Sequence, residues 1–174
     1  SECISLEALP ADMEVNYLHA NGCESLVYWP ESARVINGSV DLNGCVRLER
    51  LPKLGPISSL SLVGCTALKE LTEGMIVNSW IDLADSGVKS LPESLKGGPL
   101  RWRSVRVSEQ VIFHPDTLDL TEVLNDRNIE RRRVALDRMG RDRLLTHPKT
   151  RVLHTDTDAG GQRRLLQVPL QNDE

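Results

Sequence analysis

The chain has 174 residues, which suits one substantial core or a repeat array with one small attached domain, and argues against two large independent domains. Aromatic residues make up only 3% of the sequence, so Leu, Val and Ile must form most of the interior, as in repeat proteins. The net charge of −4 divides unevenly, with 13 acidic and 7 basic residues in 1–96 against 12 and 14 in 97–174, and a surplus of two positive charges is too small to indicate nucleic-acid binding.

A repeating unit begins at the first cysteine. Cys3, Cys23, Cys45 and Cys65 are separated by 20, 22 and 20 residues. Each is followed after three residues by Leu and after six by Leu or Trp, and Pro comes next in three of the four copies. An alternating apolar pair ends three residues before each of the last three cysteines. The unit is L-x-L-x-G-C-x-x-L-x-x-L-P, and so short a period is typical of a solenoid whose units bury one another's apolar faces.

Each unit predicts a short strand, a tight turn and an extended return segment. The alternating pair places its apolar side chains inward, and the Leu-Pro step favours an extended or 3-10 return because the residue before proline avoids the α region. A further copy runs from Ile81 to Pro92, with Ser86 in the cysteine position and a following gap shorter by one residue. Val105 and Val107 predict one last strand.

The cysteines have three interpretations. In leucine-rich repeats this column holds Asn or Cys, whose inward side chain satisfies the backbone of the neighbouring coil. Zinc ligands usually come as close C-x-x-C pairs, and no such pair occurs here. Disulfides between stacked coils stay an alternative, as does a metal site. We favour a structural ladder and expect no metal and no cofactor. The predicted ladder comprises Cys3, Cys23, Cys45, Cys65 and Ser86.

The strands are predicted to present a concave binding face. One outward column is expected to hold His19, Asp41, Ser61, Asp82 and Arg106, and the other Tyr17, Ser39, Ser59, Trp80 and Ser104. Two aromatic side chains among serines and acids form a candidate anchor for a protein or peptide carrying basic or amide groups; alternatively, the polar face only keeps the sheet soluble. The candidate partner-binding residues are Tyr17, His19, Asp41, Asn43, Trp80, Asp82, Asp85 and Arg106.

The period ends near Gly97, so the sequence predicts a leucine-rich-repeat solenoid over residues 1–96 and a capping unit over residues 97–174. After the last strand we expect a short helix over 116–125 and a second helix from the cap residue Asn128 to Gly140, with a further turn over 141–145. Two β-like runs at 151–154 and 163–168 predict a hairpin.

The C-terminal part contains three candidate groups for binding phosphate, calcium or another metal ion. Arg131, Arg132 and Arg133 offer a phosphate or nucleic-acid contact, although the acids interleaved with them favour local ion pairs. The segment from Asp156 begins like a calcium loop but has Gln167 where that loop needs Glu. The histidines of this part lack partners at ligand spacing. No catalytic motif is present, which argues against an enzyme without deciding the question.

Three segments also resemble a known family: RWRSVRV from Arg101, NDRNIERRRVALDRMG from Asn125 and HTDTDAGGQRRLLQVPL from His154. They are similar to the C-terminal region of bacterial leucine-rich-repeat proteins in which short cysteine-bearing repeats precede a domain of unassigned function. Family members continue past the equivalent of Glu174, which implies, with the absent initiator Met, an internal fragment or a processed product. A more distant likeness is to bacterial effectors whose repeats adjoin a ubiquitin ligase domain, but the Cys-x-Asp motif of that ligase is absent.

The expected fold is therefore α/β, a curved leucine-rich-repeat solenoid of short parallel strands closed by a small helical and β-hairpin unit. The expected function is a bacterial interaction module that binds a protein or peptide on the concave face, without nucleic acid or membrane. The alternatives are a targeting arm for a C-terminal nucleic-acid-binding or catalytic unit, and an injected repeat-type effector. No apolar run approaches the roughly 20 residues of a membrane helix and no secretory signal is visible, so we expect a cytoplasmic protein, or a host-cell location for an effector.

Overall fold

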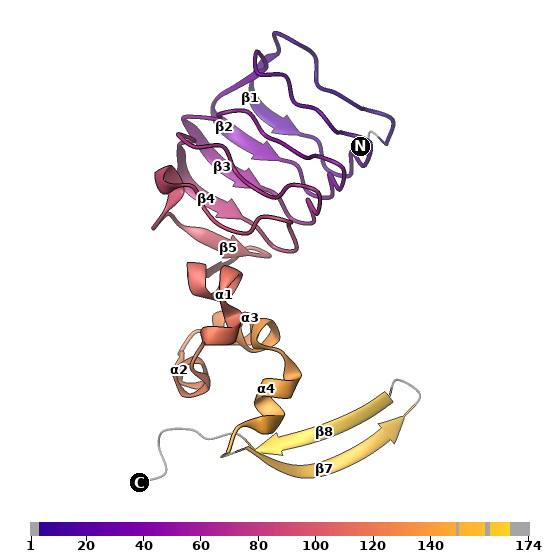
Figure 1. Cartoon of the computed structure of the whole chain (residues 1–174), viewed down its shortest axis with the longest axis vertical. Coiled ribbons are helices and arrows are strands. Elements are labelled where there is room, and N and C mark those ends of the chain that lie inside the picture. The colour runs from indigo at the N-terminus through magenta and orange to yellow at the C-terminus, as the bar shows by residue number, and fades with distance from the viewer. Residues whose placement is uncertain (1–3, 149, 159–160, 168–174) are drawn as a thin grey trace. The chain divides into compact units, whose positions relative to one another are not determined.

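The N-terminal part of the chain winds into stacked coils, each of which contributes one short strand to a sheet (Figure 1). The computed structural model describes residues 4–148, 150–158 and 161–167. The strands β1 to β5 are parallel and lie side by side in chain order. The structure is mixed α/β and contains a solenoid of stacked coils, which confirms the solenoid predicted from the sequence. The strands are β1 (Glu14–His19), β2 (Arg34–Asp41), β3 (Ile57–Ser61), β4 (Val77–Asp82) and β5 (Leu100–Trp102).

The chain divides after Phe113 into two compact units, and we describe each by itself. The first unit also contains a 3-10 turn η1 (Glu93–Leu95), the strand β6 (Val105–Val107) and a short helix α1 (Glu109–Phe113). Among the described residues the other return segments contain no helix, in keeping with the prolines that follow their last apolar residues. Strands β5 and β6 therefore belong to the same sheet as the repeats, rather than to a separate cap.

Small irregularities in strand pairing absorb the unequal spacing of the repeats. Between β1 and β2 the partner of Val15 is Val35, but the partner of Tyr17 is Ser39, so two extra residues bulge out of β2. The longest cysteine interval, 22 residues, spans this bulge. Between β3 and β4 a one-residue shift accounts for the interval of 21 residues between Cys65 and Ser86. Bulges of this kind keep the later part of each strand in register.

The turns after β1, β2 and β3 are each closed by a glycine. Gly22, Gly44 and Gly64 have φ values of 68°, 75° and 75°, a left-handed conformation that glycine adopts without steric cost. Their amides donate to carbonyl oxygens of the next coil, as in the 2.8 Å bond from Gly44 to Val63. Asp85 takes this position in the following coil, with a φ of 55°. The turn therefore requires a positive φ, which glycine provides in three coils and Asp85 in the fourth.

The cysteines after these turns connect one coil to the coil before it. The Cys45 thiol donates to the Ala20 carbonyl oxygen at 3.1 Å, and the Cys65 thiol donates to the Leu42 carbonyl oxygen at the same distance. Both side chains are completely buried, and no disulfide links them to each other or to Cys23. Burial, with a smaller contribution from the adjacent cysteine, raises the pKa of Cys45 to about 11 and that of Cys65 to about 12. Both are neutral thiols at ordinary pH.

The two ends of the proposed ladder differ from its middle. Cys3 lies outside the described residues. Ser86 keeps the backbone hydrogen bond of the turn, from its amide to the Leu83 carbonyl oxygen at 3.2 Å, but its side chain is half-exposed. Within the described part of the chain the Ser86 hydroxyl makes no hydrogen bond, so the side-chain connection does not extend to this coil.

Strand β6 runs antiparallel to β5, which the sequence did not predict. The single strand expected at Val105 and Val107 is the second arm of a hairpin whose loop is Arg103 and Ser104, with φ values of 48° and 69°. Positive φ at both central residues defines the tight hairpin turn that usually carries Asn or Gly. This turn has neither Asn nor Gly at its two central positions, so no local pattern of residues predicts the hairpin.

The second unit consists of helices followed by a hairpin. The Asn128 side chain caps α3 by accepting from the Arg131 amide at 2.9 Å, and Gly140 ends it with a φ of 83°. Asp119 caps α2 in the same way, by accepting from the Glu122 amide. Its elements are η2 (Pro115–Thr117), α2 (Leu120–Asn125), α3 (Ile129–Met139), α4 (Arg141–Thr146) and the antiparallel strands β7 (Arg151–Asp158) and β8 (Gly161–Gln167).

We expect alanine at Gly38 to disrupt the bulge between β1 and β2. A Cβ atom there would lie 1.3 Å from the Asn16 carbonyl oxygen, so one of the two strands must move. The G38A variant should lose more than about 3 kcal/mol of unfolding free energy, whereas G97A, whose Cβ has open space and a positive φ, should lose about 1 kcal/mol. Urea unfolding of both variants measures the difference, and equal losses would contradict it.

The buried thiols should make the solenoid sensitive to alkaline pH. Below pH 9 the thiols keep their protons in both states. Between pH 9 and about 11 the unfolded chain releases them while Cys45 and Cys65 do not. The unfolded state then binds fewer protons, so the unfolding free energy falls by up to about 1.4 kcal/mol per pH unit and thiol.

The variant C65A tests this dependence against the wild type. At pH 7 it should be less stable by about 0.5–1.5 kcal/mol, because the Leu42 carbonyl oxygen loses one of its two donors and keeps the Cys45 amide. Between pH 9 and 11 its unfolding free energy should fall less steeply, by the share of one thiol. Urea titrations at pH 7, 9, 10 and 11 give both quantities, and parallel curves would refute the assignment.

Candidate interaction surface on the strands

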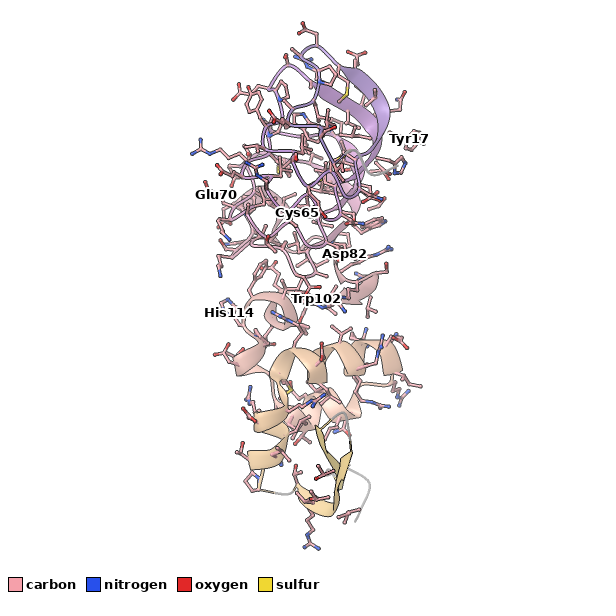
Figure 2. The ribbon with its side chains drawn as sticks, turned by 90° about the vertical axis from the view of Figure 1, so that its right-hand side faces the viewer. Tyr17, Cys65, Glu70, Asp82, Trp102 and His114 are labelled. Carbon is pink, nitrogen blue, oxygen red and sulfur yellow. The ribbon has the colours of Figure 1, made fainter. Side chains whose placement is uncertain are left out.

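The outward side chains of the sheet form two columns across the coils. Pairing aligns Tyr17 with Ser39, Ser59 and Trp80. The second column aligns His19, Asp41, Ser61, Asp82 and Arg101. Figure 2 shows Tyr17 and Asp82 on one side of the coils and Glu70 on the opposite side. We call the outward surface of β1 to β6 the strand face.

The last member of the second column differs from the sequence expectation. Arg101, not Arg106, lies beside Asp82, because the chain adds β5 before it turns back. Arg106 pairs with Arg101 from the antiparallel strand β6 and remains on the strand face. Ser104, expected in the first column, is instead in the hairpin turn. The sequence analysis did not identify Arg101, because the turn at Arg103 and Ser104 was not recognised and strand β5 was therefore not predicted.

The middle of the strand face is a floor of serines. Ser59 and Ser61 are buried, and their hydroxyls donate to Ser39 Oγ at 2.8 Å and Asn43 Oδ1 at 2.7 Å. Tyr17, by contrast, is 68% exposed at one end, and Trp80 is half-exposed at the other. Because neighbouring strands lie about 4.8 Å apart, the two aromatic residues stand roughly 14 Å from each other across the floor.

Polar side chains at the ends of the strands bind mainly to one another and to the backbone. Asn21 donates to Asp41 Oδ2 at 2.9 Å, and Asp41 Oδ1 accepts the Asn43 amide at 3.2 Å. Asn43 Oδ1 accepts the Val63 amide at 2.9 Å. His19 Nδ1 lies 4.0 Å from Asp41 Oδ2 and is largely exposed. Asp41 and Asn43 therefore support the turns, while His19 and part of Asp41 face the surroundings.

Asp82 is buried and supports the hairpin, rather than facing a partner as the sequence suggested. Only 2% of the residue is exposed. Its Oδ1 accepts the amides of Ala84 at 3.2 Å and Arg103 at 3.0 Å, and its Oδ2 accepts the Ser104 amide at 2.6 Å. A carboxylate that accepts three backbone N–H groups stabilises a turn whose two central residues have unfavourable φ values. Nearby, Asp85 is bound by the Arg103 guanidinium at 2.8 Å.

Trp80 has a cation against its ring. The Arg101 guanidinium carbon lies 4.5 Å from the ring centroid, a cation–π geometry. Both side chains are half-exposed on the strand face. Stacking holds the flat guanidinium in place and leaves its N–H edge available for an acceptor.

A groove on the opposite side of the coils was not foreseen from the sequence. Its volume is about 800 Å³, and it follows the return segments of three coils. Acidic and basic side chains alternate along it, so its charge favours no single class of ligand. The groove is lined by Tyr28, Trp29, Glu31, Arg50, Leu51, Pro52, Lys53, Glu70, Leu71, Thr72 and Glu73.

The three consecutive arginines of α3 are engaged within their own unit. Arg131 pairs with Asp126, and this hydrogen bond is the main cause of the lowered pKa of Asp126. Arg133 pairs with Glu130 at 2.8 Å. Arg132 donates to the carbonyl oxygens of Leu124 and Asp126. Two of the three arginines are therefore paired with carboxylates, and the third is bound to backbone carbonyl oxygens.

The described residues form neither a metal site nor a membrane-spanning helix. Among the described residues no group of three or more His, Cys, Asp or Glu side chains could hold a metal ion. The side chains of the calcium-like segment at Asp156 and Asp158 lie outside the described part. No helix of the described chain is long and apolar enough to cross a membrane.

Comparison of the chain with protein-family models, with curated proteins and with solved structures gave no match.

Replacing Asp82 by Ala should destabilise the solenoid even though no partner is present. Three backbone N–H groups would lose their acceptor, and we expect a loss of about 2–4 kcal/mol in unfolding free energy. The variant S104G should recover part of this loss in the double mutant, because glycine removes the strain of the positive φ.

Urea unfolding and amide hydrogen exchange at Arg103 and Ser104 measure these effects. The matched control is D41A, whose carboxylate is partly exposed and accepts one backbone amide. A loss no larger for D82A than for D41A would show that the carboxylate does not hold the turn.

Proposed function

We propose that the protein is a leucine-rich-repeat interaction module that binds an extended peptide or a protein segment on a concave strand face. The observation that supports it best is the arrangement of Tyr17 and Trp80 as two accessible aromatic side chains at opposite ends of a buried serine floor. Aromatic residues contribute most to binding when a flat, water-excluding surround adjoins them. The repeat unit, with its turn glycine and inward cysteine, fits the leucine-rich-repeat type.

The floor can accept a backbone because its own side chains are small and hydrogen-bonded to each other. The Ser39 and Ser59 hydroxyls are hydrogen-bonded to each other at 2.8 Å, so they lose few hydrogen bonds to water when a peptide covers them. The desolvation free energy of this surface is therefore small. A peptide crossing the strands would place side chains against Tyr17 and Trp80, roughly 14 Å apart, and a basic group near the exposed His19 and Asp41 edge. His19, Asp41, Trp80 and Tyr17 are thus the residues we expect to contact a partner directly.

The remaining candidates have other roles in this proposal. Asn43, Asp82 and Asp85 hold turns and position the contact residues. The second unit, with its capped helices and hairpin, is proposed to act as a cap. A nucleic-acid-binding second unit has less support, since Arg131, Arg132 and Arg133 are already engaged.

The proposal is tested by selecting binders from a displayed random peptide library and measuring their Kd. Y17A and W80A should each raise the Kd by about tenfold or more, as expected for an aromatic anchor. Y28A is the matched control, because Tyr28 is also an exposed aromatic residue but lines the groove on the other side. Urea midpoints of all three variants should stay close to wild type.

Two results would contradict the proposal. If no selected peptide binds with a measurable Kd, the strand face is not a peptide site. If Y28A abolishes binding while Y17A and W80A leave it unchanged, the groove is the binding surface instead.

A further inference from the structure

The hairpin of β5 and β6 places two arginines side by side on the strand face. Arg101 and Arg106 are directly opposite each other in the antiparallel pair, so their side chains point to the same face. The Cβ atoms of such a pair lie about 5 Å apart, and like charges in this position repel. The arrangement is unfavourable unless an anion lies between or beside them.

The acids near this pair are already occupied. Asp82 is buried and accepts three backbone amides, and Asp85 is bound by Arg103. Among the described residues neither Arg101 nor Arg106 has a carboxylate within ion-pair distance. This end of the strand face therefore has a net charge of one positive unit, from two acids and three arginines: Asp82, Asp85, Arg101, Arg103 and Arg106.

Arg101 is also held in a defined orientation. Its guanidinium stacks on the Trp80 ring at 4.5 Å, which fixes the plane of the group without using its N–H donors. An oriented guanidinium binds a carboxylate through two parallel hydrogen bonds, and its neighbour Arg106 adds a second cation. The half-exposed Trp80 ring supplies an apolar surface beside the charge.

We propose that Trp80, Arg101 and Arg106 form a carboxylate-binding site that recognises an acidic residue in a peptide lying on the strand face, an inference that rests on the proposed function. A side-chain carboxylate fits better than a phosphate, because Asp41 and Asp82 stand in the same column as Arg101 and the local surplus is a single positive charge.

The same geometry defines the spacing of the partner's charges. Asp41 on β2 and Arg101 on β5 are separated by three strand spacings, roughly 14 Å. An extended peptide covers this distance in about four residues, at close to 3.4 Å per residue. The partner should therefore have a basic residue near Asp41 and an acidic residue about four positions away, near Arg101.

The probe is the acetylated and amidated heptapeptide Ala-Lys-Ala-Ser-Ala-Glu-Ala, compared with twins that have Gln or phosphoserine in place of Glu. Binding is measured by calorimetry and by the NMR shift of the Trp80 indole N–H. We expect the Glu peptide to bind about tenfold more tightly than the Gln twin, since a charge-assisted pair is lost. R101Q and R106Q should each remove most of this difference.

The charge-matched control is R50Q, because Arg50 lines the groove on the opposite side and its loss changes the net charge equally. R50Q should preserve the preference for Glu, and added salt should weaken it in wild type.

Three outcomes would overturn the inference. Equal affinity for the Glu and Gln peptides, with binding still lost in Y17A, would refute carboxylate recognition and leave the interaction module standing. Tighter binding of the phosphoserine twin would show that the site takes phosphate. The absence of any Trp80 shift with all three peptides would refute the site, while the library selection reports separately on the function.

Discussion

Coils of about 20 residues can stack only if the backbone groups at the turn after each strand find partners in a neighbouring coil. Two devices meet this need. Amides of the turn, such as that of Gly44, donate forward to the next coil, while the thiols of Cys45 and Cys65 donate backward to carbonyl oxygens of the previous one. Both thiols are completely buried, and each gives its acceptor a second donor, because the Ala20 and Leu42 carbonyl oxygens also accept an amide of their own turn. The leucines of the repeat are buried between the coils that these hydrogen bonds connect.

The strand face follows from this constraint. Since the turns are fixed, the residues just before them recur in register, and two outward columns are aligned across the coils. The columns carry few large side chains, and the large ones stand at the ends. Where the regular turn is replaced, at Asp85, the neighbouring Asp82 is buried and binds the hairpin that follows. Two carboxylates thus bind the hairpin at the transition from parallel coils, Asp82 through backbone amides and Asp85 through the Arg103 guanidinium.

Much of the fold could be predicted from the sequence because the spacing of cysteines and leucines reports the length of a coil directly. The inward pairs, the glycine turns and the helix cap at Asn128 all have local residue signals. The hairpin of β5 and β6 has no such signal. Arg103 and Ser104 are unusual in a turn with two positive φ values, and their conformation depends on the Asp82 carboxylate, about 20 residues earlier in the chain. For the same reason the sequence assigned Asp82 to the surface and overlooked Arg101.

The bulge at the start of β2 has a consequence for how such a scaffold can change. Surplus residues enter where a strand begins, opposite Asn16, and the pairing has recovered by Ser39. In the pairs β1–β2 and β3–β4 the difference in repeat length is therefore taken up where the strands begin and not at the turns that follow them. The bulge is itself bound to both neighbouring coils, since the Ile36 carbonyl oxygen accepts from the Asn16 side chain and the Asn37 amide donates to the Pro56 carbonyl oxygen, so the two added residues join the coils while the aligned columns keep their register.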